Sequence, residues 1–72
     1  MLMYEFVRET NGERVFAYYP EGNRNAPGTV VVETIGIGHV VEASSEDFGN
    51  RYAFHAIKNI DPTKKSGTVA WY

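Results

Sequence analysis

The 72-residue sequence contains no cysteine. This absence excludes disulfide bonds, zinc sites built from thiolates and catalysis by a thiol nucleophile, and it fits a reducing compartment. The sequence also lacks an apolar stretch approaching the roughly 18 residues of a membrane-spanning helix. Residues 1–8 include Glu5 and have neither the basic start nor the apolar run of a signal peptide. We therefore expect a cytoplasmic protein that is not attached to a membrane.

Positive charge is also scarce, because 7 Lys and Arg residues stand against 9 Asp and Glu, for a net charge of -2. A chain with this balance lacks the broad positive field that attracts phosphate backbones. Aromatic residues, by contrast, are plentiful: four Phe, five Tyr and one Trp. With the Val and Ile residues they indicate a folded chain. We expect one domain, residues 1–72, whose thin core gains stability from association with a partner or with itself.

The clearest local signal is the Asn11-Gly12 dipeptide between residues 2–10 and 13–19. Asn-Gly adopts the two positive φ angles of a type I′ hairpin turn, so these segments are predicted to pair as antiparallel strands. In the simplest register Glu9 faces Arg14 and Val7 faces Phe16. One face of the hairpin then collects the residues that we expect in the core: Leu2, Tyr4, Phe6, Val15, Ala17 and Tyr19.

A second hairpin is predicted from two β-branched runs, residues 29–34 and 37–43, joined through Ile35-Gly36. Gly38 marks an expected bulge. The preceding residues, 20–28, are rich in Pro, Gly and Asn and read as an exposed loop. At the other end of the chain, residues 68–72 have β propensity and are expected to return to the sheet.

Between residues 45 and 60 the apolar period changes from two to about 3.6, which predicts an amphipathic helix. Asp61-Pro62 ends it. The apolar positions that fall within one half of the helical wheel, and are expected to be buried, are Phe48, Tyr52, Ala53, Ala56, Ile57 and Ile60.

The start of this helix is less well defined than its end. Ser44 or Ser45 is expected to cap it, and Asp47 is expected to pair with Arg51 one turn later. Gly49-Asn50 lowers helix propensity within the first turns. The alternative is therefore a helix that begins near Asn50, with residues 45–49 as a separate turn.

These elements predict an α+β fold in the order ββ-ββ-α-β, with one helix on one face of a mostly antiparallel five-stranded sheet. The alternative is a small SH3-like barrel in which part of residues 51–58 forms a strand, because Tyr52, Phe54 and Ala56 also alternate. We favour the helix because its six-position stripe is longer than that alternation.

Catalytic and metal-binding patterns are weak. His39 and His55 have no neighbour at metal-ligand spacing, so neither a metal nor another cofactor is predicted. Acid-base or nucleophilic catalysis would use His39 or His55 as the base, with a serine or carboxylate near the helix start as its partner. Helix capping and the helix dipole already explain serines and acids at this position. We therefore expect no enzyme. These candidates are Glu42, Ser44, Ser45, Glu46 and Asp47.

Phe54 departs from the amphipathic pattern, because the wheel places it about 140° from the centre of the apolar stripe, among charged residues. An exposed aromatic ringed by charge is typical of a protein-interaction hot spot, although Phe54 could instead pack against Trp71 or the loop of residues 20–28. We predict a non-enzymatic protein-interaction or structural module. Its expected binding surface comprises Arg51, Phe54, His55 and Lys58, with Trp71 and Tyr72 from the last strand.

Single-stranded nucleic-acid binding is the alternative function. Exposed aromatic residues would stack on bases beside local basic residues, although the negative net charge argues against it. A catalytic or small-molecule-binding function would require a pocket near His39 or His55. The residues of the nucleic-acid alternative are Arg14, Phe16, Tyr18, Arg24, Lys64 and Lys65, together with Tyr72.

Overall fold

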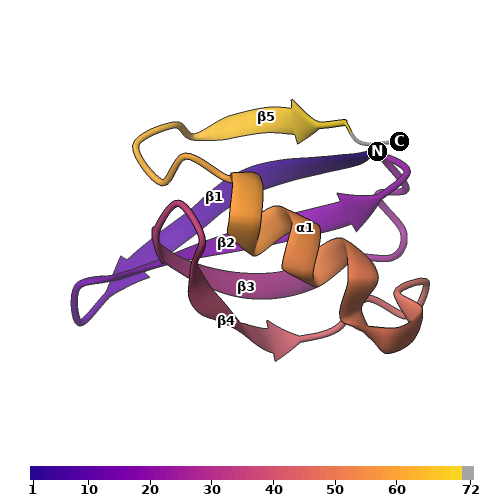
Figure 1. The fold of residues 1–72 in the computed structure, drawn as a ribbon, viewed down its shortest axis with the longest axis horizontal. Helices are drawn as coiled ribbons and strands as arrows, with labels where there is room; N and C mark the ends of the chain where they lie inside the picture. Colours follow the sequence, from indigo (N-terminus) through magenta and orange to yellow (C-terminus); the bar gives the residue numbers. More distant parts are fainter. Residues whose placement is uncertain (71–72) are drawn as a thin grey trace.

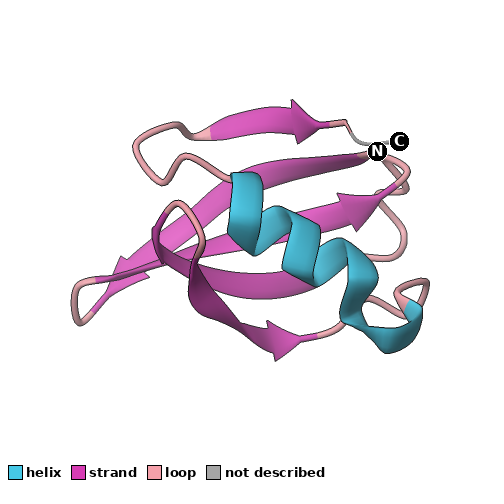
Figure 2. Ribbon diagram, viewed as in Figure 1, coloured by secondary structure: helices cyan, strands magenta, loops and turns pink. Residues whose placement is uncertain are grey.

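The computed structural model describes residues 1–70, which form a five-stranded sheet with one helix packed across one of its faces (Figures 1 and 2). The predicted α+β class and the order ββ-ββ-α-β are confirmed. The elements are β1 (Leu2–Thr10), β2 (Glu13–Pro20), β3 (Gly28–Thr34), β4 (Ile37–Glu42), the 3-10 turn η1 (Phe48–Asn50), α1 (Arg51–Asn59) and β5 (Ser66–Val69).

The sheet has the strand order β4-β3-β2-β1-β5, and every neighbouring pair is antiparallel. Both hairpins therefore pair strands that are adjacent in the sequence, and β5 returns to the outer side of β1. The edge strands β4 and β5 do not meet, so the sheet is open. The SH3-like barrel is thus wrong, and residues 51–58 belong to the helix instead of a strand.

The first hairpin starts in the predicted register, with Thr10 opposite Glu13 and Glu9 opposite Arg14. A bulge between Phe6 and Arg8 then shifts the register, so that Phe16 lies opposite Phe6 instead of Val7. A bulge inserts an unpaired residue, and every later side chain of the pair then changes its partner. The predicted pairing of Val7 with Phe16 is therefore wrong.

The same bulge changes which side of β2 enters the core. Phe16 and Tyr18 are fully buried in the core, whereas Ala17 and Tyr19, which were expected there, are only partly buried on the opposite face. Val15 is buried but lies outside the main core cluster. The core positions predicted on β1 are correct for Leu2, Tyr4 and, partly buried, Phe6.

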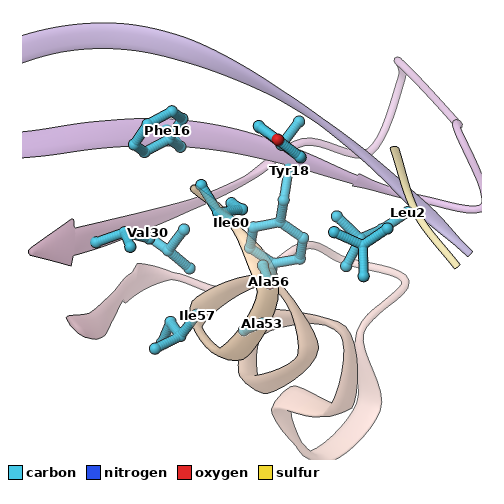
Figure 3. Packing of buried hydrophobic residues seen from close by; sticks show 11 residues of the cluster. Leu2, Phe16, Tyr18, Val30, Ala53, Ala56, Ile57 and Ile60 are labelled. Atoms are coloured by element: carbon cyan, nitrogen blue, oxygen red, sulfur yellow. The ribbon is translucent and has the colours of Figure 1, made fainter. Parts of the chain in front are cut away.

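The core lies between the sheet and α1 (Figure 3). The small side chains of Ala53 and Ala56 let the helix approach the sheet closely, and Ile57 and Ile60 cover the neighbouring positions. Tyr52 packs against the edge of this cluster. The buried members of the cluster are Leu2, Tyr4, Phe16, Tyr18, Val30, Val32, Ala53, Ala56, Ile57, Ile60 and Val69.

The second hairpin joins β3 and β4 through Ile35-Gly36, as predicted, and the helix holds this turn because the Gly36 N–H donates to the carbonyl oxygen of Ile57 over 2.9 Å. The ladder is irregular next to Gly38, where Glu33 has no partner. A Cβ atom at Gly38 would collide with the carbonyl oxygen of Val31, so a close backbone approach requires glycine at this position.

Within residues 1–70 no helix is long and apolar enough to cross a membrane.

Candidate interaction surface

The segment before the helix breaks the helical period. Gly49 and Asn50 both have left-handed backbone angles, with φ of 74° and 59°, and regular helix begins only at Arg51. Of the two predicted helix starts, the later one is therefore correct. Left-handed residues interrupt the helical period, so Phe48 does not share the buried face of the helix. Phe48 is 83% exposed. The prediction that Phe48 is buried is wrong.

The buried carboxylate of Asp47 holds this segment in place. Its Oδ1 accepts a hydrogen bond from the N–H of Tyr52, and its Oδ2 accepts one from the N–H of Ala53, both over 3.0 Å. The Tyr18 hydroxyl donates a third bond to Oδ2 over 2.8 Å. Asp47 therefore satisfies the free N–H groups of the first helical turn instead of pairing with Arg51, and neither Ser44 nor Ser45 caps the helix.

Ser44 links the same segment to the rest of the fold. Its N–H donates to the Tyr18 hydroxyl over 3.0 Å, and its own hydroxyl donates to the carbonyl oxygen of Ala26 over 2.6 Å. Burial, with a smaller contribution from the bond to Asp47, raises the pKa of Tyr18 to about 12. The network joins β2, the loop between β2 and β3 and the start of the helix, so Phe48 projects from an anchored turn.

Two shallow depressions meet at Arg51 on the outer side of the helical segment. One has a volume of about 220 Å³ and is lined by Glu46, Phe48, Arg51 and Tyr52. The other has a volume of about 200 Å³ and is lined by Arg51, Phe54, His55 and Lys58, the four helix residues that the sequence placed on one surface. We call Phe48, Arg51, Phe54, His55 and Lys58 the helix-face patch.

Phe54 is 54% exposed in this patch, as the helical wheel predicted. Trp71 and Tyr72, which were expected to extend the surface, lie outside the described residues. Phe48 adds a second exposed aromatic residue to this surface, one that was expected in the core. The exposure of Phe48 was not predicted because the helical wheel assumed a continuous helix through Gly49-Asn50. This dipeptide is the sequence signal that the helical period is interrupted.

The helix-face patch contains two cations, Arg51 and Lys58, and the carboxylate of Glu46 lines the depression beside Phe48. Within residues 1–70 neither Arg51 nor Lys58 forms an ion pair. The pairs that do form lie elsewhere: Arg24 with Glu5, Arg14 with Glu9, and the amino terminus with Glu21. Two cations that form no ion pair with the described residues therefore line the same depression as Phe54.

The structure does not bring together the residues of the nucleic-acid alternative. Phe16 and Tyr18 are fully buried, so the prediction that they stack on bases is wrong. The guanidinium groups of Arg14 and Arg24 are ion-paired, and they also lie over the rings of Phe6 and Tyr19, at 4.5 and 4.8 Å from the ring centres. Among the described residues of the set, Lys64 and Lys65 are exposed in the turn before β5 without an ion pair, and Tyr72 lies outside the described residues.

Two of the catalytic candidates, Ser44 and Asp47, are buried and hydrogen-bonded in the anchoring network. His39 lies on β4 opposite Val31. The depression beside His55 has no hydroxyl or carboxylate among its described lining residues, and it is smaller than the roughly 300–1,000 Å³ of a typical ligand pocket. In the part of the chain that the structure describes, no cluster of three or more His, Cys, Asp or Glu residues could hold a metal ion.

No protein-family model, no curated protein and no solved structure matches the chain. The geometry and charge of the helix-face patch are therefore the basis for inferring its function.

Proposed function

We propose that this chain is a non-enzymatic, cytoplasmic protein-interaction module that binds a partner protein through the helix-face patch. The observation that carries the proposal is the exposure of two phenylalanine rings, 83% for Phe48 and 54% for Phe54, on either side of Arg51. Exposed aromatic residues next to arginine are enriched among the residues that contribute most to protein interfaces.

Three contributions favour binding at the helix-face patch. Full burial of a phenylalanine side chain contributes about 1.5–3 kcal/mol, so a partner that covers both rings gains substantially. The Asp47 network already fixes the turn that carries Phe48, so little ordering of that turn is needed on binding. Within residues 1–70 Arg51 and Lys58 have no ion pair to break before they contact acidic groups on a partner.

The proposal is tested by affinity capture from the native cell extract, followed by a titration of the identified partner with purified protein. Phe48→Ser and Phe54→Ser should each raise the dissociation constant by about tenfold or more, since each removes a buried ring from the contact. Val7→Ser is the matched control, because Val7 is an exposed apolar residue on β1 outside the patch. Equal binding by all four proteins would contradict the proposal.

A further inference from the structure

The edge strand β4 is open to further pairing. Its outer side pairs with no strand within residues 1–70, and it is six residues long, whereas the other edge strand, β5, has four. Edge strands of stable monomers are commonly protected by lysine, by proline or by a β-bulge. β4 contains no lysine or proline, and a bulge at Val41 interrupts its ladder with β3. Two of its apolar residues, Ile37 and Val41, are each 55% exposed.

The sequence of β4 is self-complementary around His39. If two copies pair antiparallel with His39 opposite His39, Ile37 of each copy lies opposite Val41 of the other. Glu42 of each copy then lies opposite Gly36 of the other, so the two Glu42 carboxylates do not face each other. Apolar pairs opposite one another stabilise an antiparallel ladder. The register covers the regular part of β4, Ile37–Val40, and includes Val41, where a bulge interrupts the ladder with β3.

The face of the sheet turned away from α1 supports the same arrangement. His39 lies opposite Val31, which lies opposite Val15, and both valines are buried without belonging to the core beneath the helix. They form a second, smaller apolar row that runs across the sheet to the β4 edge. Pairing of two edges at His39 would join this row to its copy.

We propose that β4 is a self-association edge, at which a second copy of this chain adds its own β4 antiparallel in the register centred on His39. The product is a dimer with one continuous ten-stranded sheet. Its two copies are related by a two-fold axis perpendicular to the sheet, so both helices lie on the same face. The dimer uses main-chain hydrogen bonds together with the Ile37–Val41 contacts. It does not depend on the proposed function, because none of these residues belongs to the helix-face patch.

The first test measures molar mass by light scattering and sedimentation over a wide range of protein concentration. Wild type should form a dimer, and Val41→Lys and Ile37→Lys should each raise its dissociation constant by about tenfold or more, because each places charge in both apolar pairs. Val7→Lys is the matched control on β1, and Phe54→Ser controls for the helix-face patch. Both should remain dimeric, and circular dichroism checks that every variant is folded.

The second test fixes the register and uses the absence of cysteine from the chain. In His39→Cys the two cysteines face each other within the range of Cα distances that a disulfide spans, so mild oxidation should give a covalent dimer. In Ile37→Cys the two cysteines lie about four residues apart along the paired strands, roughly 14 Å, and should not cross-link.

Three results would overturn the proposal. Wild type that stays monomeric at every concentration would mean that the bulge at Val41 protects the edge. A dimer that is lost in Phe54→Ser but kept in Val41→Lys would place the contact on the helix. Cross-linking of Ile37→Cys as fast as His39→Cys would exclude the register.

Discussion

Phe16 and Phe48 are the same residue type at opposite extremes of exposure, 0% and 83%. Phe16 lies in β2, which has a strand on either side and the helix above it, so its ring is enclosed from every direction. Phe48 precedes two left-handed residues that separate it from the regular helix. The backbone around each residue therefore decides whether an aromatic ring belongs to the core or to the surface.

The two regions are nevertheless connected. Tyr18, two residues after Phe16 on the buried side of β2, donates to the same Asp47 carboxylate that holds the turn carrying Phe48. The core thus supports the exposed ring through one buried polar contact.

Phe16→Ala should lower the free energy of unfolding by about 3–5 kcal/mol, because it removes a fully buried ring from the centre of the core. Since a domain of this size is stable by about that amount, the variant should be largely unfolded, and Phe16→Leu provides a folded intermediate case. Phe48→Ala should change stability by less than about 0.5 kcal/mol. Urea titrations followed by circular dichroism measure all three, and similar losses at positions 16 and 48 would contradict the comparison.

Alkaline pH should destabilise the fold through Tyr18. Its folded pKa of about 12 lies above the ordinary value of 10.0, so the unfolded state releases this proton first as pH rises. The stabilisation is complete below pH 10 and falls by about 3 kcal/mol as pH rises toward 12. Urea titrations from pH 8 to pH 12 measure this loss.

Tyr18→Phe is the control for that pH dependence. Burial also raises the pKa of Tyr4 and Tyr19, and a hydrogen bond to Glu21 raises that of Tyr52, so a weaker dependence of the same sign should remain. A variant with the same alkaline loss as wild type would show that Tyr18 is not its main source.

Asp47→Ala should cost about 2 kcal/mol, because two helix N–H groups and the Tyr18 hydroxyl lose their common acceptor. It should also weaken binding of the partner by releasing the turn that carries Phe48. Asp47→Asn keeps the shape of the side chain and should lose less stability. Denaturant titrations and the partner titration measure the two effects, and a binding loss without a stability loss would contradict the anchoring role.

Gly49→Ala should have the smallest effect, about 1 kcal/mol. Nothing lies within 4 Å of the added Cβ, so the cost comes only from the left-handed backbone with φ of 74°. Gly38→Ala, where the added Cβ meets the Val31 carbonyl, provides the contrast and should cost considerably more. Thermal unfolding of the two variants measures the difference, and equal losses would argue against a purely conformational cost at Gly49.

Most of the fold could be predicted from the sequence because its strongest signals are local. Asn11-Gly12 and Ile35-Gly36 set the two hairpins, and the residues after Arg51 have a regular helical period. The bulge at Val7 has no glycine or proline to announce it, and it moved Phe16 and Tyr18 from the expected surface into the core. A shift of one residue reverses the faces of a strand, so a single unrecognised bulge changes every assignment beyond it.

The outer side of the helix could be predicted from local spacing alone, because residues three and four apart share a helical face. Its members that line one depression are Arg51, Phe54, His55 and Lys58. The burial of Asp47 against Tyr18 and the exposure of Phe48 could be seen only in the folded structure. Those outcomes depend on contacts between residues far apart in the chain and on a left-handed turn. Neither produces a periodic pattern in the sequence.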